Sequence, residues 1–315
     1  MQRDIEIIVN NSEITAGTRG ASLGPSAILT AARKQKNKLF GAYPIHVLKD
    51  YNHQLDQSHS TPFAKRIDTF KLVFQSIADK THDLLKANRF PLILAGDHGS
   101  AAGTIAGIKA AYPNKRLGVI WIDAHGDLHS PYTTPSGNMH GMPLALSLGE
   151  DNKEFKRNDL DQHTIDSWDE LKAATSGIQK LLPTDLVFIA VRDTEKEEDA
   201  IIERYSITNH SVEVVRSKGA KEIAELALEQ LKECDQIYIS FDVDSMDPDV
   251  TSYGTGTPVK NGLLPEEATE ILSILVSDSK TICLEIVEVN PCLDDKINKM
   301  AETTFSIIEK VIKSI

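Results

Sequence analysis

The stretch from Leu117 to Asp127 constrains the fold of this chain more than any other. It begins as an apolar run, Leu117 to Ile122, and then places Asp123, His125 and Asp127 at every second position. Alternate residues of an extended segment point to the same side. We therefore expect a buried strand whose end presents three metal-ligand side chains together.

Apolar runs typical of buried strands alternate with helical segments along almost the whole chain. The expected strands are residues 5–10, 44–48, 90–95, 117–124, 185–191, 212–215, 236–241 and 281–289. The expected helices are residues 27–34, 63–87, 100–112, 195–205, 218–232, 265–275 and 297–312. Continuous apolar strands between helices are typical of a mostly parallel sheet that is covered on both faces. The sequence therefore predicts an α/β protein, a single three-layer αβα domain over residues 1–315. No linker, low-complexity tract or internal repeat divides it.

One long segment does not fit this alternation. Residues 150–176 are polar and without clear periodicity, and we expect them to be irregular, with His163 and Trp168 at the surface.

Composition narrows the classes of partner and compartment. The formal net charge of -12 disfavours nucleic acid and anionic membranes as partners. The three cysteines, Cys234, Cys283 and Cys292, form no C-x-x-C pair, which argues against a disulfide framework or a zinc–thiolate site. No apolar stretch is long enough for a signal peptide or a membrane span. We therefore expect a soluble, cytoplasmic protein.

Polar residues end three of the expected strands, where ligands bind in open α/β sheets. They are His98, then Asp123, His125 and Asp127, then Asp242 and Asp244. Two imidazoles and four carboxylates suit two divalent cations that share carboxylates and hold a bridging hydroxide as the nucleophile. The absence of thiolates favours two Mn²⁺ over a structural zinc site. Strand-end aspartates can also merely cap the next helix. Three such motifs in one chain favour the metal site.

The same motifs resemble those of the arginases, members of the ureohydrolase family. The matching segments are Gly96–His98, Asp123–Asp127, Ser240–Pro248 and Glu288–Pro291, within a resemblance that runs from about Arg19 to the C-terminus. The resemblance implies a binuclear Mn²⁺ site that hydrolyses a guanidinium group to urea and an amine. It also implies that Asp123 and Asp242 bridge the metals, that His98 and Asp127 complete one, and that His125 and Asp244 complete the other.

The segment Ser136–Pro143 is similar to the arginase loop that binds the amino-acid head group, and agmatinases differ there. The expected contacts are Ser136 and Asn138 for the carboxylate, Glu195 and Glu198 for the ammonium, and Glu288, oriented by Thr257, for the guanidinium. His140 is expected to protonate the leaving amine, because its ordinary pKa lies near the operating pH. The expected catalytic residues are therefore His140, Glu288 and Asp127.

Four positions depart from the arginase pattern. His129 stands where Asn is usual, Glu195 where Asp is usual, Gly99 where Ser is usual, and Ala95 where Gly is usual. His129 is either a loop histidine or a donor to the substrate carboxylate. The acidic run that contains Glu195 and Glu198 can equally be a solvated helix start. Arg19 is expected to be a surface residue.

The leading hypothesis is an arginase, which converts L-arginine and water to L-ornithine and urea. Another ureohydrolase, such as an agmatinase, guanidinobutyrase or formiminoglutamase-like enzyme, is the alternative that His129 and Glu195 support. A zinc deacetylase on a related fold would need tandem histidines that are absent here. A catalytically silent binding subunit would be expected to lack metal ligands. The resemblance also implies a homo-trimer or homo-hexamer.

Overall fold

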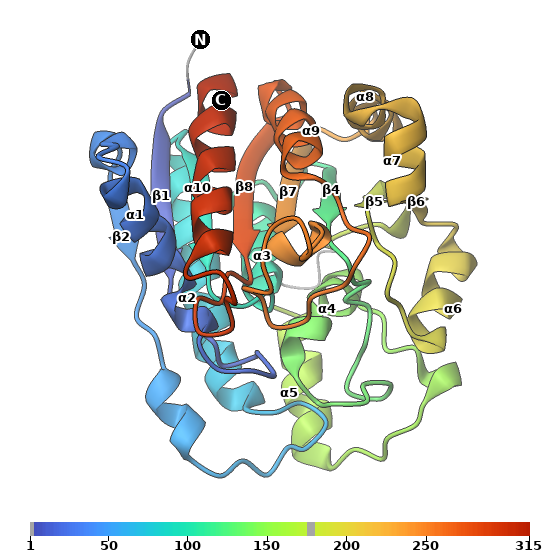
Figure 1. Ribbon diagram of the computed structural model, residues 1–315. Helices are drawn as coiled ribbons and strands as arrows, with labels where there is room; N and C mark the ends of the chain where they lie inside the picture. The colour runs from blue at the N-terminus through green and yellow to red at the C-terminus, as the bar shows by residue number, and fades with distance from the viewer. Residues whose placement is uncertain (1–2, 175–179) are drawn as a thin grey trace.

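The computed structural model describes residues 3–174 and 180–315, and its centre is one sheet of eight strands (Figure 1). Every strand pairing is parallel, so the sheet is entirely parallel and the expected fold class is confirmed. In spatial order the strands are β2 (Ile45–Val47), β1 (Ile5–Asn10), β3 (Phe90–Ala95), β8 (Thr281–Val287), β7 (Gln236–Asp242), β4 (Leu117–Ile122), β5 (Leu186–Ile189) and β6 (Thr208–His210).

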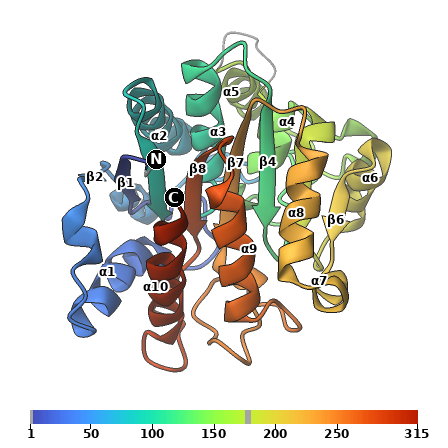
Figure 2. The same ribbon diagram turned by 90° about the horizontal axis from the view of Figure 1, so that it is seen from above.

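Helices cover both faces of the sheet, as Figure 2 shows. One face carries α1 (Gly24–Lys34), α7 (Val212–Lys218), α8 (Ala220–Gln230), α9 (Pro265–Ser277) and α10 (Lys299–Val311). The other carries α2 (Ile67–Lys86), α3 (Ser100–Ala111), α4 (Pro143–Leu148), α5 (Gln162–Lys172) and, through Ile201, α6 (Lys196–Tyr205). The central strands β3 and β4 are buried at every position because both of their faces are covered. This explains their unbroken apolar sequences.

The polar segment of residues 150–176 is not irregular where the structure describes it. Helix α5 begins after Asp161, whose side chain accepts a hydrogen bond from the N–H of Thr164. Ile165, Trp168 and Leu171 are three residues apart, and the last two are buried. Trp168 is 0% exposed and donates from Nε1 to Asp151 at 2.8 Å, so its expected surface position is wrong, whereas His163 is exposed. Residues 175 and 176 lie outside the described residues.

The strand expected at residues 212–215 is also wrong, because these residues begin α7. The side chain of Ser211 caps the helix by accepting from the N–H of Val214, and this local bond outweighs the β propensity of three valines. The strand between α6 and α7 is instead β6. Its three residues are polar, so the apolar pattern did not predict it. Within the described residues, no helix has the length and apolar character needed to cross a bilayer.

Candidate metal centre

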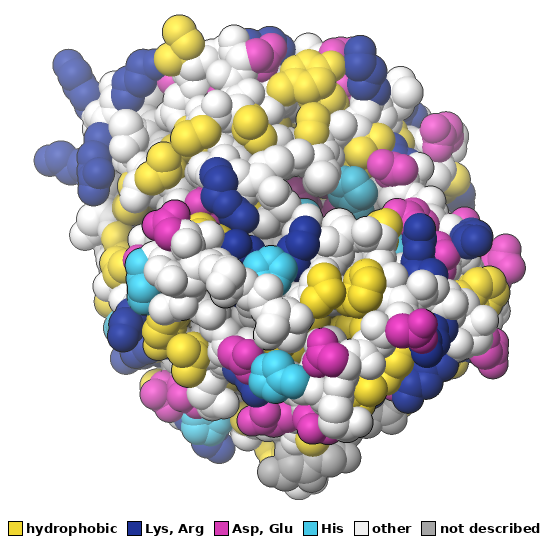
Figure 3. All heavy atoms as spheres, turned by 90° about the horizontal axis from the view of Figure 1, so that it is seen from below, with side chains coloured by type: hydrophobic (Ala, Val, Ile, Leu, Met, Phe, Trp, Pro, Cys, Tyr) yellow, Lys and Arg dark blue, Asp and Glu magenta, His cyan; other side chains and the backbone are white. Residues whose placement is uncertain are grey.

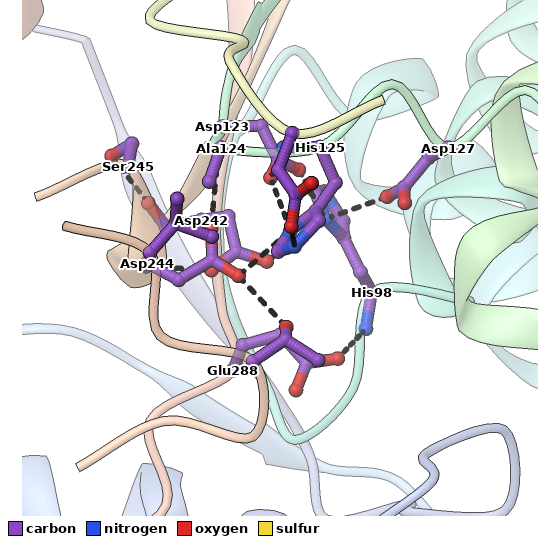
Figure 4. Close-up of polar contacts among 12 residues, drawn as sticks. His98, Asp123, Ala124, His125, Asp127, Asp242, Asp244, Ser245 and Glu288 are labelled. Atoms are coloured by element: carbon purple, nitrogen blue, oxygen red, sulfur yellow. Dashed lines mark hydrogen bonds and ion pairs between the residues drawn. The ribbon is translucent and has the colours of Figure 1, made fainter. Parts of the chain in front are cut away.

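Four adjacent strands, β3, β8, β7 and β4, end on the same side of the sheet, the lower side in Figure 1. Asp123 and Glu288 directly follow β4 and β8, β7 itself ends at Asp242, and His98 lies three residues after the end of β3. Figure 4 shows these side chains turned toward one another. The parallel sheet thus assembles residues that are far apart in the sequence, as the strand-end argument predicted.

His98 lies at the centre of this group. Its Nδ1 atom is 3.0 Å from Asp123 Oδ2, 3.2 Å from Asp127 Oδ2 and 3.1 Å from Asp242 Oδ2. The ring stacks on Trp121 with centroids 4.1 Å apart. Its Nε2 atom is 2.7 Å from the Ser240 hydroxyl oxygen. A proton on Nε2, donated to this oxygen, leaves the Nδ1 lone pair directed at the three carboxylates.

The two aspartates expected to be shared have the same local geometry. Oδ1 of Asp123 accepts the N–H of His125 at 2.8 Å, and Oδ1 of Asp242 accepts the N–H of Asp244 at 2.8 Å. Each aspartate therefore forms a turn over two residues that fixes one oxygen and directs the other toward His98. This geometry gives a physical reason for the two-residue spacing in both motifs.

His125 belongs to a second group on the other side of Asp123. Its Nδ1 atom is 3.1 Å from Asp244 Oδ2 and 3.5 Å from Asp123 Oδ1. Two sets of ligand atoms are close enough to hold one ion each, namely His98, Asp123 and Asp127 in the first and Asp123, His125 and Asp244 in the second. Asp123 is common to both, and Asp242 contacts the first set through His98.

The chemistry of these donors fits divalent cations. Asp123, Asp242 and Asp244 are at most 2% exposed, and a buried carboxylate without a cation is costly. Burial and the neighbouring Asp244 and Asp123 raise the pKa of Asp242 well above its ordinary value, and burial and Asp123 raise the pKa of Asp127 to about 6. In addition, His98 Nδ1 and Asp123 Oδ2 are buried and have no hydrogen-bond partner among the described residues. Cations at this point would satisfy both atoms and offset the repulsion.

A pocket opens above these ligands, and its wall contains every residue that the sequence predicts to bind the substrate. They are His129, Ser136, Asn138, Glu195, Glu198, Thr257 and Glu288, together with His140. The expected contact between Thr257 and Glu288 is wrong, because the Thr257 hydroxyl donates to Asp244 Oδ2 at 3.0 Å. Thr257 lies beside the second ligand set, and its hydroxyl therefore bonds to a carboxylate of that set.

His140 and Glu288 form a pair beside the first ligand set. Nδ1 of His140 is 3.4 Å from Glu288 Oε1, and this oxygen also accepts the N–H of His98 at 2.8 Å. Burial lowers the pKa of His140, but the charges of Glu288, Asp127 and Asp97 outweigh it, and the net shift is upward. Glu288 has a left-handed backbone with φ of 66°, a strained conformation that is common at functional sites.

Asp97, in the first motif, is directed away from the ligands. Its Oδ2 atom accepts the N–H of Thr15 at 2.8 Å. Burial and the charge of Glu288 raise its pKa to about 7. Asp97 therefore ties the loop after β1 to the loop after β3.

His129 faces two acidic side chains at the far end of the pocket. It is buried, and its Nδ1 atom is 3.1 Å from the Thr133 hydroxyl. Its Nε2 atom is 3.7 Å from Glu198 Oε2 and 3.9 Å from Glu195 Oε1. Glu198 also accepts the N–H groups of Leu128 and Glu195, at 3.0 and 3.1 Å, so it is fixed at the start of α6. His129 is therefore part of the pocket and is not a solvated loop histidine.

Some residues of the site had no role in the sequence argument. Ser240 precedes Asp242 by two positions on β7 and so lies on the same side of the strand, a signal that could have identified it. Asp193 follows β5, and its Oδ2 atom is 3.8 Å from His125 Nε2. Ser240 is within hydrogen-bond distance of the rear of His98, where partners that orient a metal ligand are usually found, whereas Asp193 is near His125 but beyond hydrogen-bond distance.

A parallel α/β sheet whose strands end in two adjoining carboxylate–imidazole groups has the site of a two-metal hydrolase. The chain matches the Arginase family over residues 3–313. It is 31% identical to an arginase of Bacillus subtilis, over 99% of this chain and 98% of that protein. The chain belongs to the arginase family.

Solved structures agree with this assignment. The arginase of Bacillus caldovelox, 30% identical, superposes with a TM-score of 0.82 over 98% of each chain. The Entamoeba histolytica arginase in complex with L-ornithine, 26% identical, has a TM-score of 0.80 over 98% of this chain and 99% of that one.

Proposed function

We propose that this protein hydrolyses the guanidinium group of L-arginine and releases L-ornithine and urea. Membership of the arginase family supports the reaction class, a hydrolysis of a C–N bond in a linear amidine. The observation that carries the proposal is the pairing of two ligand sets on the floor of a pocket with polar groups at its far end. Such a pocket suits a guanidinium at its floor and an amino-acid head group at its rim.

Two Mn²⁺ ions are the metals that the donors suit best, because carboxylates and imidazoles without thiolate favour borderline-to-hard ions. Asp123 and Asp242 would be shared between the ions. His98 and Asp127 would complete one ion, and His125 and Asp244 the other. When bound, the pair would supply a hydroxide nucleophile from water near neutral pH.

Glu288 and His140 are suited to the two remaining chemical tasks. The carboxylate of Glu288 can hold the cationic guanidinium next to the ligands, since it already lies against His98. As water adds to the guanidinium carbon, the bond from this carbon to the chain nitrogen breaks and its electron pair stays on the nitrogen. The leaving amine then needs a proton, which His140 can donate while Glu288 stabilises its charged form.

The head group would be held at the rim. Ser136, Asn138 and His129 would donate to the α-carboxylate, and Glu195 and Glu198 would accept from the α-ammonium. These assignments are supported by the pocket lining and by the polarity of each group.

Substrate panels test the proposal directly. Urea release would be measured for the Mn²⁺-loaded enzyme with L-arginine, agmatine and 4-guanidinobutyrate, and formamide release with formiminoglutamate. We expect L-arginine to have the highest kcat/KM. A higher kcat/KM for agmatine or guanidinobutyrate would contradict the head-group assignment but leave the metal centre in place.

The second candidate is another ureohydrolase, and one contact favours it. Arg157 Nη1 is 3.2 Å from Glu195 Oε2, so an acceptor intended for the ammonium is partly used by the protein itself. An agmatinase, guanidinobutyrase or formiminoglutamase would need a different head-group site. The same substrate panel distinguishes these enzymes from an arginase.

We also infer a homo-trimer or homo-hexamer from the family resemblance. Light scattering of the purified protein would give its mass, and a monomer at micromolar concentration would contradict this inference.

A further inference from the structure

A short segment before α2 lies against the loop that carries Ser136 and Asn138. The N–H of Lys65 donates to Gly137 O at 2.8 Å. Gly137 has φ of 75°, and a side-chain carbon added there would lie 1.8 Å from Pro62 O. The two segments therefore fit together closely, and Lys65 has a fixed place beside the head-group loop.

The ammonium of Lys65 orients the Asn138 amide. Its Nζ atom is 3.2 Å from Asn138 Oδ1. An ammonium has only donors, so the amide oxygen must face Lys65 and the amide NH₂ must point elsewhere. Asn138 lines the pocket, and no acceptor in the described part of the chain takes its NH₂ group. The pocket wall at this point therefore offers donors to an anion and repels a cation.

Other cationic side chains lie near Lys65. The side-chain hydrogen bonds of Arg66 and Arg19 in the described residues go to backbone carbonyls, at Leu55 for the first and at positions 13, 16 and 18 for the second. Burial and the charges of Arg66 and Lys65 lower the pKa of His59, which indicates that these groups are close together. Figure 3 shows Lys and Arg side chains near the middle of the face onto which the pocket opens. Lys65 therefore lies near other cationic side chains, in a chain with a net charge of -12.

Another part of the pocket wall is acidic, with Glu195 and Glu198 beside His129. A ligand with a carboxylate on one side and an ammonium on the other matches this arrangement of charge. We propose that Lys65 is a specificity-determining positioning residue, which holds Asn138 as a donor and makes the site select guanidino substrates that carry a carboxylate. This inference rests on the proposed function and adds a residue that the ligand and head-group motifs do not include.

The test compares L-arginine with agmatine, which is arginine without its carboxylate. In Lys65→Met the ammonium is lost and the aliphatic chain is kept. We expect KM for L-arginine to rise about five- to tenfold, with kcat within about twofold and with kcat/KM for agmatine unchanged. Lys65→Arg should recover most of the loss. The control is Lys71→Met in the helix that follows, α2, where Lys71 pairs with Glu170 and Asp68, and this change should affect neither substrate.

Equal losses for both substrates would show a merely structural role and overturn the proposal, as would an unchanged KM for L-arginine. Calorimetry with L-ornithine and with putrescine, its decarboxylated counterpart, separates this proposal from the proposed function. If the wild type does not hydrolyse L-arginine, the proposed function fails. The positioning role of Lys65 is still supported if Lys65→Met weakens only ornithine binding. It is refuted if the change affects the binding of both ligands or of neither.

Discussion

At the scale of single residues, the proposed metal centre depends on side chains that are not candidate ligands themselves. Ser240 is buried and its hydroxyl oxygen is 2.7 Å from His98 Nε2. Removing this partner frees the ring to rotate and to carry its proton on the wrong nitrogen.

We therefore expect Ser240→Ala to weaken Mn²⁺ binding about 10–100-fold, measured by titration against a metal-sensitive dye. Ser252→Ala is the control, because Ser252 is also fully buried but bonds to Asp294, away from the ligands. Equal Mn²⁺ affinity in both variants would mean that Ser240 does not orient His98.

His140 has a different role in the same centre. His140→Asn should lower kcat for urea release about 10²–10⁴-fold, because the leaving amine loses its proton donor. The metal content, measured by mass spectrometry, should remain that of the wild type, since His140 belongs to neither of the two candidate ligand sets found in the described residues. Loss of metal in this variant would contradict a purely acid–base role.

The grouping of the candidate ligands could be predicted from the sequence, but the directions of the side chains beside them could not. Asp123 and His125 were identified by the two-residue period that an extended strand end imposes. Asp97 is an equally acidic strand-end residue, yet it turns to the N–H of Thr15, which lies 82 positions earlier. Thr257 turns to Asp244 for a similar reason. Such choices depend on which loop lies next to the side chain, and only the folded chain determines that.

At the scale of elements, the apolar periodicity predicted the sheet and most helices, whereas capping residues determined the exceptions. Ser211 and Asp161 each start a helix where the hydrophobic pattern was weak or favoured a strand. The expected helix from residue 63 begins only at Ile67, because Arg66 has a left-handed backbone with φ of 59°. Local hydrogen bonds of this kind compete with propensity, and a pattern of apolar residues does not record them.

Helix α5 gives a test of this correction. Trp168→Ala should lower the free energy of unfolding by about 3–5 kcal/mol, because a large buried side chain is replaced by a cavity. His163→Ala on the same helix is exposed and should change it by no more than about 0.5 kcal/mol. Chemical denaturation measures both, and similar values for the two variants would contradict the burial of Trp168.

The head-group loop is tested by two glycines with the same backbone conformation. Gly137 and Gly149 have φ of 75° and 72°, but only Gly137 is crowded, by Pro62 O. Each change to Ala should cost about 1–2 kcal/mol through the backbone. In addition, Gly137→Ala should displace the loop and raise KM for L-arginine, whereas Gly149→Ala should not. Equal KM values would show that the contact with Pro62 does not position the loop.

At the scale of the whole molecule, the ligand groups link stability to metal and to pH. Without ions, the folded pKa of Asp97 is raised to about 7 and those of His98 and His125 are raised above 6.5. The folded protein then binds more protons than the unfolded chain. For Asp97 this holds between about pH 4 and pH 7, and for the two histidines it holds from about pH 6.5 upward. The apo protein must lose stability as the pH rises through these windows.

Calorimetry should therefore show a Tm of the EDTA-treated protein that falls between pH 5 and 8. Saturating Mn²⁺ should raise Tm at pH 8 by about 5 °C or more. The gain should shrink toward pH 5, because the ligands must be deprotonated to bind metal. A Tm for the apo protein that rises over this range would contradict the linkage.

The strand order has a consequence for the synthesis of the protein. Strands β3 and β4, which precede His98 and Asp123, are separated in the sheet by β8 and β7, which are made last. At roughly 5–20 residues per second, a ribosome needs about 10–30 s to proceed from Asp127 to Glu288. Until Asp242 and Asp244 are made, the nascent chain has four of the six candidate ligands and an incomplete sheet. Capture of the two proposed ions would thus be a late event, and a product of stalled translation would expose a partial set of metal ligands.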